Sequence, residues 1–391
     1  MTLAADAFGL AFGSMTVPEA LALREDAQAR HLPAADRRRF APLLSIADLD
    51  AFLRTDAART PRVSMADSSR NGSAAVPDDL YADEEGRIDP VGLFQLFDGG
   101  ATLVVSQFHE MHPPLARFCR GLEKLFLHAV QANIYLTPPG AQGFRTHFDT
   151  HDVLVLQVSG TKKWRVWGDM LMPHATRNTP WDGAVHRADP AGARDVLLEA
   201  GDVLFVPRGV AHDASVQEGS EPSLHVTVGL LEPSWADALK AAIDQMEQAQ
   251  PALRQSFRTW RLADEAARAG LVTAARERLA AVATEESLDL VAMRFLQQLG
   301  TDRMVMPGRG LLAPKPGLDD RLVLADSVHH YVVPVGEGAE LRWAGPAEPL
   351  GPTELGWIER LAEGATPREL GGEAALAFCS RLVALGLLER A

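Results

Sequence analysis

Two histidines and one aspartate carry the clearest chemistry in the sequence. His147 and Asp149 stand two residues apart at the head of an apolar, β-branched run, so on a strand their side chains would leave the same face. His212 follows a second apolar run and a Pro-Arg-Gly turn that ends that strand. Two imidazoles and one carboxylate from separate strands hold a non-haem Fe(II) and leave coordination positions open. The sequence therefore predicts a metal site at these three residues.

A His-x-Asp pair alone is more often an ordinary surface or hydrogen-bonded pair than a metal site. Two linked glycine-containing motifs weigh against that alternative here. The second motif has the spacing G-x5-P-x-G-x2-H, in Gly201, Pro207, Gly209 and His212. The first motif has the order glycine, histidine, aspartate, glycine, in Gly140, His147, Asp149 and Gly160. Both are typical of cupins, and the two together arise by chance far less often than one pair.

The segments around these motifs resemble a known family. NIYLTPPG precedes the first histidine, H-x-D-x-HD runs into an apolar strand with Gln157, and a glycine turn then leads to KKWR. In these features the chain resembles the JmjC-type cupin oxygenases, and within them the ribosomal oxygenases, over about residues 90 to 232. The resemblance implies Fe(II), 2-oxoglutarate and O2 as reactants. Spacing predicts only a metal, and the co-substrate comes from the resemblance alone.

A dicarboxylate co-substrate needs a buried cation, because a charge removed from water must be paired. Lys162 and Lys163 face opposite sides of their strand by alternation, which leaves open the one that points inward. The resemblance assigns Lys162 to the co-substrate and leaves Lys163 facing solvent. It also places Asn133 and Thr227 around 2-oxoglutarate, with His225 near the metal pocket.

Asn133, Tyr135 and Thr137 share one face of the predicted strand at residues 130–136. Their polar face has two interpretations: it lines a cavity, or it makes hydrogen bonds on a solvated surface. His151 shares a face with Asp149, but three ligands are already present and the family does not use that position. The remaining histidines that lack a partner pattern are assigned structural or surface roles: His109, His112, His128, His186, His329 and His330.

The elements around the site predict an α+β protein of three parts. Residues 1–232 would form a JmjC/cupin catalytic domain, a double-stranded β-helix (jelly roll) after a helical lead-in. Residues 233–303 show helical periodicity interrupted near Pro251 and Gly270. In ribosomal oxygenases such a region mediates dimerisation, so the resemblance implies a homodimer.

Residues 304–391 have the order of a winged helix. Strands are predicted at 322–324, 331–333 and 341–343, and helices at 353–361, 367–370 and 373–385. The helical stretches carry more glutamates than arginines, whereas a phosphate-contacting face needs clustered cations. We therefore expect no direct DNA binding, and a structural or protein-contact role instead.

Two segments are predicted to be loops because they are rich in turn-forming residues and lack the periodicity of a helix or strand. Residues 55–87 are rich in Ala, Asp, Ser, Gly and Pro and predict a mobile loop, which serves either as a lid over the site or as a plain surface excursion. Residues 168–200 predict an insertion between barrel strands where substrate specificity could reside.

Composition sets the class of protein. The 391 residues carry 52 acidic and 38 basic side chains, a net charge of −14, which suits a basic protein partner and disfavours a broad nucleic-acid footprint. No apolar run is long enough to span a membrane, and the first residues lack the basic start of a secretory signal, so a cytoplasmic location is expected. Cys119 and Cys379 are far apart in apolar surroundings and predict buried free thiols.

Three functions are compatible with these residues. The first is hydroxylation of a side chain in a ribosomal protein, and the bacterial relatives incline the choice towards arginine over histidine. The second is the same chemistry on another peptide or a small metabolite. The third is a metal-binding cupin without catalysis that recognises a partner.

Overall fold

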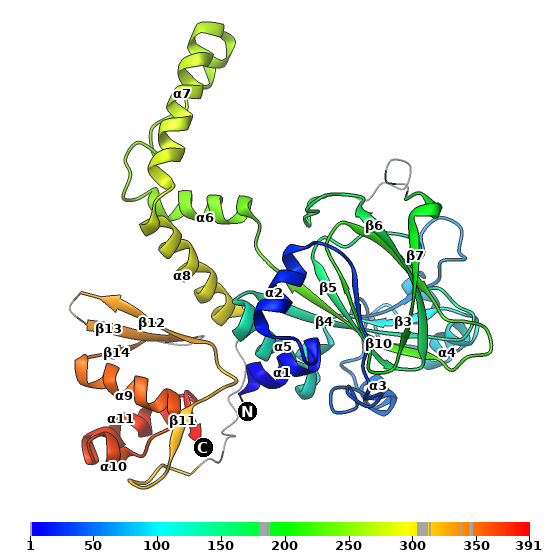
Figure 1. Ribbon diagram of the computed structural model, residues 1–391, viewed down its shortest axis with the longest axis horizontal. Coiled ribbons are helices and arrows are strands. Elements are labelled where there is room, and N and C mark those ends of the chain that lie inside the picture. Colours follow the sequence, from blue (N-terminus) through cyan, green and yellow to red (C-terminus); the bar gives the residue numbers. More distant parts are fainter. Residues whose placement is uncertain are drawn as a thin grey trace. The chain divides into compact units, whose positions relative to one another are not determined.

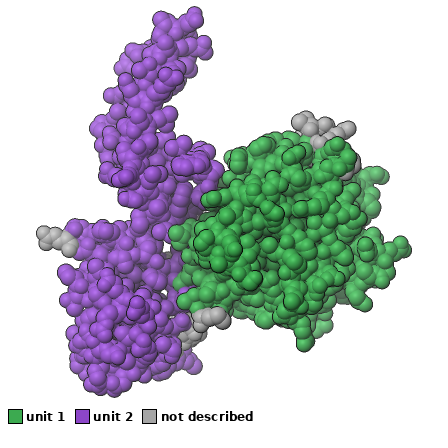
Figure 2. Space-filling model, in the orientation of Figure 1, with its two compact units in different colours: residues 1–232 green, residues 233–391 purple. Residues whose placement is uncertain are grey.

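The apolar runs of the first 232 residues form strands that assemble into two sheets (Figure 1). The structure, a computed structural model, describes residues 2–179, 186, 188–302, 312, 314–336, 338–343 and 347–391. The chain divides into two units, residues 1–232 and residues 233–391 (Figure 2). The finer division at 303/304 lies outside the described residues and stays a prediction.

All strand pairs of the first unit are antiparallel. The larger sheet has the order β1-β8-β5-β10-β4-β3-β2. Its strands are β1 (Arg30–Leu32), β2 (Val63–Ala66), β3 (Thr102–Val105), β4 (Ala129–Thr137), β5 (Asp152–Ser159), β8 (Val203–Val206) and β10 (Ser223–Leu231). The smaller sheet has the order β7-β6-β9, from β7 (Ala193–Glu199), β6 (Thr161–Met170) and β9 (Val210–Ser215). This double sheet confirms the predicted jelly-roll core and the α+β class.

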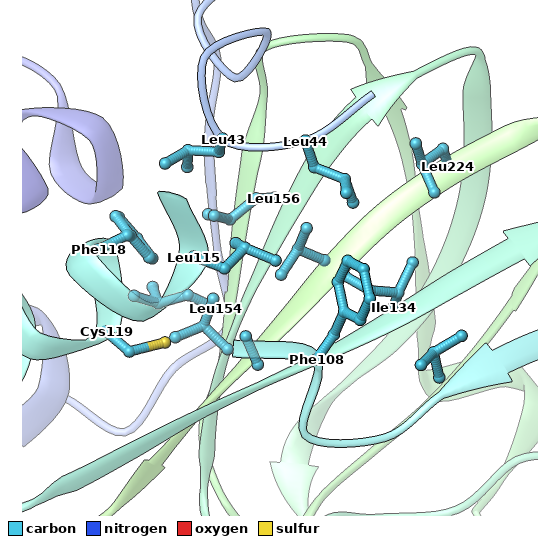
Figure 3. Packing of buried hydrophobic residues seen from close by; sticks show 14 of the residues in the cluster. Leu43, Leu44, Phe108, Leu115, Phe118, Cys119, Ile134, Leu154, Leu156 and Leu224 are labelled. Atoms are coloured by element: carbon cyan, nitrogen blue, oxygen red, sulfur yellow. The ribbon is translucent and has the colours of Figure 1, made fainter. Parts of the chain in front are cut away.

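Alternation along β5 gives the larger sheet two different apolar faces. Leu154 and Leu156 point to one face and are fully buried in a cluster with Leu115 of helix α5 (Pro113–Phe126) (Figure 3). Val153 and Val155 point to the other face and pack with β6, β7 and β9 of the smaller sheet. Each large aliphatic side chain buried in this way contributes about 1.5–3 kcal/mol. The sheet is therefore fixed from both sides, and the interior between the two sheets is left for the site.

Helices α1 (Leu3–Phe12), α2 (Val17–Glu25), α3 (Ile46–Leu53) and α4 (Pro90–Asp98) complete the first unit with α5. Short 3₁₀ turns lie at Asp78–Leu80, Phe108–Glu110 and Pro190–Gly192. Helix α2 begins with a capping box, in which Thr16 and Glu19 each bond the other residue's backbone N–H. The helical lead-in is thus confirmed, although it also contains the short strand β1.

Two predicted loops contain strands that sequence reading missed. The prediction of a mobile loop over residues 55–87 is wrong for Val63–Ala66, because this segment forms β2 and pairs with β3. The predicted insertion at 168–200 contains β7, with Val196 and Leu198 buried and Leu197 exposed. Long connections separate both strands from the partners that supply their hydrogen bonds. Residues 180–185 and 187 of the insertion lie outside the described residues.

The second unit begins with helices α6 (Trp235–Met246), α7 (Glu265–Val282) and α8 (Glu285–Asp302), with a 3₁₀ turn at Thr259–Ala263. Ser234 begins α6 with a capping box that it forms with Asp237. The predicted interruption at Gly270 is wrong, because Gly270 lies inside α7. A glycine inside a helix costs only about 1 kcal/mol, which neighbouring helix-forming residues offset.

The remainder of the second unit has the order of strands and helices expected of a winged-helix-like fold. Its elements are β11 (Leu322–Leu324), β12 (His330–Val335), β13 (Gly338–Trp343), β14 (Glu348–Leu350), α9 (Pro352–Glu363), α10 (Pro367–Leu370), α11 (Glu373–Ala384) and β15 (Leu388–Arg390). Sequence reading missed β14 and β15. Cys119 and Cys379 are buried free thiols, as predicted. None of the helices in the described part of the chain combines the length and the apolar character that a membrane span needs.

Candidate metal and co-substrate site

The first histidine is positioned by a backbone pair that joins two distant segments. His147 and His212 form an isolated antiparallel bridge, with N–H to O distances of 3.0 and 2.8 Å in the two directions. His212 lies on β9, whereas His147 and Asp149 lie in an irregular segment just before β5. The prediction that the pair stands on a regular strand is therefore wrong. The bridge to β9, in place of a continuous strand, sets the direction of His147.

A glycine turn brings the other two residues together. Gly209 has a φ of +81°, and its N–H donates to the carbonyl of Asp149 at 2.9 Å. A Cβ at this position would lie 1.9 Å from the carbonyl oxygen of Met172. Only glycine fits such a conformation with so close a backbone neighbour. The turn before β9 therefore fixes both Asp149 and the start of the strand that carries His212.

The three side chains converge on one point. One ligand atom from each of His147, Asp149 and His212 lies within 4.8 Å of the others. His212 Nε2 is 3.5 Å from Asp149 Oδ2, and the two imidazole rings are 4.5 Å apart. The structure thus brings together the three predicted ligand residues, and the cluster does not include His151.

Backbone carbonyls orient both imidazoles. The Nδ1 of His147 lies 2.8 Å from the carbonyl oxygen of Arg145, and the Nδ1 of His212 lies 3.0 Å from that of Val210. A carbonyl can only accept, so each Nδ1 carries the proton and each Nε2 keeps its lone pair. Burial, and then the neighbouring His147, lowers the pKa of His212 to about 4. A neutral imidazole with a free Nε2 is the form that binds a metal.

A second carboxylate supports this end of the site without facing the ligands. Asp213 is buried and accepts hydrogen bonds from Arg165 Nε and Nη2 at 2.8 and 2.7 Å. It also accepts from the Thr146 hydroxyl at 2.6 Å. Thr146 precedes His147 and Asp213 follows His212, so this bond ties the two ligand segments together. Sequence reasoning missed Asp213, for which the signal was an acidic residue opposite an arginine in paired strands.

The other end of the interior holds a buried lysine. The Lys162 side chain is 5% exposed and its Nζ donates to the Thr137 hydroxyl at 2.8 Å. No carboxylate pairs with it among the residues that the structure describes. Burial without a charged partner lowers the pKa of Lys162 to about 7. Lys163 faces the opposite way and its Nζ lies 2.7 Å from Asp195 Oδ2.

The polar faces of β4 and β10 lie opposite each other between these two ends. His225 is paired in register with Tyr135, and Thr227 with Asn133. The rings of His225 and Tyr135 stack at 4.9 Å with an interplanar angle of 4°. Burial, and then the charge of Lys162, holds the pKa of His225 well below its usual value. The Asn133 Oδ1 accepts from the backbone N–H of Gln107 at 2.9 Å.

These residues line one cavity that opens to solvent, with about 710 Å³ of empty space when its open part is included. Of the two interpretations of the polar face, the lined cavity is therefore correct. The lining contains every predicted site residue and also His151. It adds residues to which the sequence assigned no site role, namely Thr102, Phe144, Trp164 and Asp213. Of these, Trp164 follows from alternation, because it stands two residues after Lys162 on β6.

Several buried polar atoms in this cavity lack protein partners. His225 Nδ1 and Trp164 Nε1 have none among the described residues, and both side chains line the cavity. Buried polar atoms normally find a partner. The indole N–H and the Lys162 ammonium are both donors, so they suit an acceptor-rich anion. The residues present therefore fit a metal held by two imidazoles and a carboxylate, and a dicarboxylate paired with Lys162.

Comparison with known proteins agrees with this arrangement. Residues 104–238 match the JmjC domain family. Human ribosomal oxygenase 1 is 30% identical over 217 residues, which are 55% of this chain and 33% of the relative. The bifunctional lysine-specific demethylase and histidyl-hydroxylase NO66 of Drosophila yakuba is 34% identical over 175 residues, 41% of this chain and 25% of the relative. The match thus spans about a third or less of these two curated relatives.

The solved structures match over nearly the whole chain. The ribosomal oxygenase YcfD of Escherichia coli superimposes with a TM-score of 0.54 at 18% identity, covering 97% of this chain and 99% of the other. The same protein in complex with cobalt and 2-oxoglutarate matches with a TM-score of 0.53 at 16% identity, over 96% and 98% of the two chains. At this identity the likeness establishes the fold, including that of the second unit.

Proposed function

From the premise that the chain carries a JmjC domain of the kind found in ribosomal oxygenases, we propose that it is an Fe(II)- and 2-oxoglutarate-dependent protein hydroxylase. One observation carries the proposal: a single cavity is lined both by the cluster of His147, Asp149 and His212 and by Lys162, a buried lysine that has no carboxylate partner among the described residues. A metal alone would explain the three-ligand cluster but not the buried lysine. A metal together with an anionic co-substrate explains both.

His147, Asp149 and His212 would hold Fe(II), and Lys162 would pair with the distal carboxylate of 2-oxoglutarate. When bound, iron, 2-oxoglutarate and O2 supply the oxidising power that converts a substrate C–H to C–OH, with succinate and CO2 as co-products. The protein residues position the reactants. Thr137 would hold the Lys162 ammonium in place through the hydrogen bond that it accepts. Three protein ligands would leave coordination positions for the co-substrate and O2.

Asn133, Thr227 and His225 would complete the contacts of the co-substrate. Their support is position: all three line the same cavity as the cluster and Lys162. His225 is held neutral by burial and by the Lys162 charge, so its Nδ1 can serve either as donor or as acceptor. It therefore adjusts to a ligand group without adding a second positive charge.

A ribosomal protein is the proposed substrate class. Similar proteins are named ribosomal oxygenases, and a net charge of −14 favours the approach of a basic protein. Arginine is favoured over histidine as the oxidised residue, because the bacterial structures match nearly the whole chain, whereas the eukaryotic relatives match only part. Direct DNA binding is not proposed, and a cytoplasmic location stays a prediction.

The test is incubation of the chain with Fe(II), 2-oxoglutarate and ribosomal proteins from the same cell, followed by peptide mass spectrometry. We expect one arginine-containing peptide to gain one oxygen atom. The His212→Ala variant should give no product, whereas His151→Asn, which changes a cavity histidine outside the cluster, should retain metal-dependent 2-oxoglutarate turnover. Equal activity of His212→Ala would overturn the metal assignment. Turnover only with another peptide or a small metabolite would replace the substrate class.

A homodimer through residues 233–303 is a second part of this proposal. Phe257, Trp260, Val272 and Leu279 in this region are exposed apolar side chains. Scattered apolar residues are normal on surfaces, but these four occur close together along the chain, which favours an interface. Sedimentation at micromolar concentration should show a dimer, and Trp260→Glu should shift it to monomer. A wild-type chain that sediments only as monomer would contradict the dimer but not the chemistry.

A further inference from the structure

A short segment that lines the cavity makes two kinds of contact, one with the cluster residues and one with a loop from an earlier part of the chain. We call residues 142–146 the rim strap. Phe144 from this strap lines the cavity and is 38% exposed, with its ring 6.1 Å from Tyr135 and 5.9 Å from His147. The exposed aromatic surface thus lies beside the metal cluster. The next residue, Arg145, uses its side chain elsewhere.

The guanidinium of Arg145 binds the backbone of a loop that lies much earlier in the sequence. We call residues 67–75 the rim loop. Arg145 Nε donates to the carbonyl of Ser68 at 3.1 Å, and its other nitrogens donate to the carbonyls of Arg70 and Gly72. The N–H of Ser68 donates in return to the carbonyl of Gln142 at 3.0 Å. All these bonds use the loop's backbone, so Arg145 ties the loop to the strap, while the bond from the N–H of Asp67 to the carbonyl of Ala74 closes the loop itself.

Two side chains of the loop are available for other contacts, whereas those of Asp67, Ser69 and Ser73 bond within the loop. Asn71 is exposed, and the side chains of Arg70 and Asn71 make no hydrogen bond to the described residues. The rim loop therefore offers an amide and a guanidinium just outside the strap. A polypeptide carries alternating backbone donors and acceptors that match such groups. A small metabolite held inside the cavity would not extend to them.

Arg145 also contacts the metal cluster through its backbone. Its carbonyl accepts the Nδ1 proton of His147 at 2.8 Å. One residue thus orients a proposed metal ligand with its main chain and holds the rim loop with its side chain. A substitution of the side chain that keeps the backbone separates the two contributions.

We propose that Arg145 is a positioning residue that holds the rim loop as a docking wall for the polypeptide substrate, with Phe144 against the side chain to be oxidised. This inference rests on the proposed function and names the surface that its substrate uses. The flanking residues of the substrate dock on the rim loop, while the target side chain passes Phe144 into the cavity.

The test compares Arg145→Gln with Arg59→Gln. Arg59 is a matched control because it also donates to backbone carbonyls, those of Asp56 and Glu85, away from the strap. For Arg145→Gln we expect faster amide hydrogen exchange in residues 67–75 and a rise of about tenfold in KM for the substrate polypeptide, with kcat nearly unchanged. The Kd values for Co(II) and for 2-oxoglutarate should stay within about twofold, since the cavity is intact. Arg59→Gln should leave KM and exchange in the rim loop unchanged.

Several outcomes would overturn the inference. Unchanged exchange in the rim loop would show that Arg145 does not position it. Faster exchange with an unchanged KM would make the loop a structural feature only, and a fall in kcat with weaker Co(II) binding would place the effect at His147. A Phe144→Leu variant that keeps the wild-type KM would remove Phe144 from the docking wall. Wild-type chain that binds neither Co(II) nor 2-oxoglutarate would instead contradict the proposed function, and the exchange measurement would still decide the role of Arg145.

Discussion

The two ends of the cavity satisfy their polar groups in opposite ways. At the metal end, both imidazoles donate to backbone carbonyls, and Asp213 beside them accepts from Arg165 and Thr146. At the lysine end, Lys162 has one hydroxyl as partner, and His225 Nδ1 and Trp164 Nε1 have none among the described residues. The protein itself satisfies the polar groups at the first end, whereas those at the second end have no negatively charged partner among the described residues.

This difference indicates which function each end of the cavity serves. Backbone hydrogen bonds fix the direction of the metal ligands before any metal arrives, which lowers the ordering cost of binding. The lysine end instead keeps a buried cation at an energetic cost that an anion would relieve. The metal end therefore determines where the chemistry occurs, and the lysine end determines which co-substrate is retained. The predictions below alter one end at a time.

Removal of a ligand at the metal end should have the largest effect. Asp149→Ala takes away the only carboxylate of the cluster, so Co(II) affinity should fall by more than about 100-fold, beyond the usual cost of an outer contact. Titration calorimetry with Co(II) measures this. Asp195→Ala is the control, because Asp195 forms an ion pair with the outward-facing Lys163 and lies outside the cluster. Retained Co(II) affinity in Asp149→Ala would show that the cluster is not the metal site.

Removal of the cation should affect 2-oxoglutarate and leave the metal in place. Lys162→Met keeps the length of the side chain but not its charge, so Kd for 2-oxoglutarate should rise about 30-fold or more, as when a buried charge pair loses one partner. Co(II) affinity should stay unchanged. The ligand-free variant should unfold at a higher temperature than the wild type, because no unpaired charge remains buried. Lys163→Met is the control, and a lower melting temperature for Lys162→Met would contradict the picture of an unpaired cation.

The lysine end should also make the protein sensitive to pH. Burial lowers the pKa of Lys162 from 10.5 to about 7, so between these values the unfolded chain binds a proton that the folded chain has lost. The unfolding free energy contributed by this group therefore rises with pH across that window. Affinity for 2-oxoglutarate should do the reverse and fall above pH 7, by up to about tenfold per pH unit, since the charged lysine binds the anion. Lys162→Met serves as the reference, and parallel pH profiles of both proteins would exclude Lys162 as the titrating group.

The comparison also separates what sequence can and cannot predict. Period-two alternation along residues 130–136 correctly placed Asn133, Tyr135 and Thr137 on one face, because each strand's geometry is local. The same rule could not choose between Lys162 and Lys163, since the inward side of a strand depends on the whole barrel. The resemblance to a family supplied that choice.

Non-local pairing explains the features that sequence reading missed. β2 and β7 take their hydrogen bonds from strands that long connections separate from them. Arg145 reaches carbonyls more than 70 residues away, and no local pattern records such a contact. Gly270 shows the opposite error, because a local helix-breaking signal was outweighed by the rest of α7. The ligand residues could be named in advance, whereas their supporting contacts could not.

The smallest predicted effect concerns the one hydroxyl that holds the lysine. Thr137→Val keeps the shape of the side chain but removes the acceptor of the Lys162 Nζ bond, whose net worth is about 1–1.5 kcal/mol. Kd for 2-oxoglutarate should therefore rise by about five- to tenfold, less than in Lys162→Met. Thr102→Val is the matched control, because Thr102 donates to Thr137 but makes no hydrogen bond with the lysine. If Thr137→Val and Lys162→Met weaken the binding of 2-oxoglutarate equally, the hydroxyl of Thr137 and not the ammonium of Lys162 is the principal contact. The contrast between the two ends would then rest on Thr137.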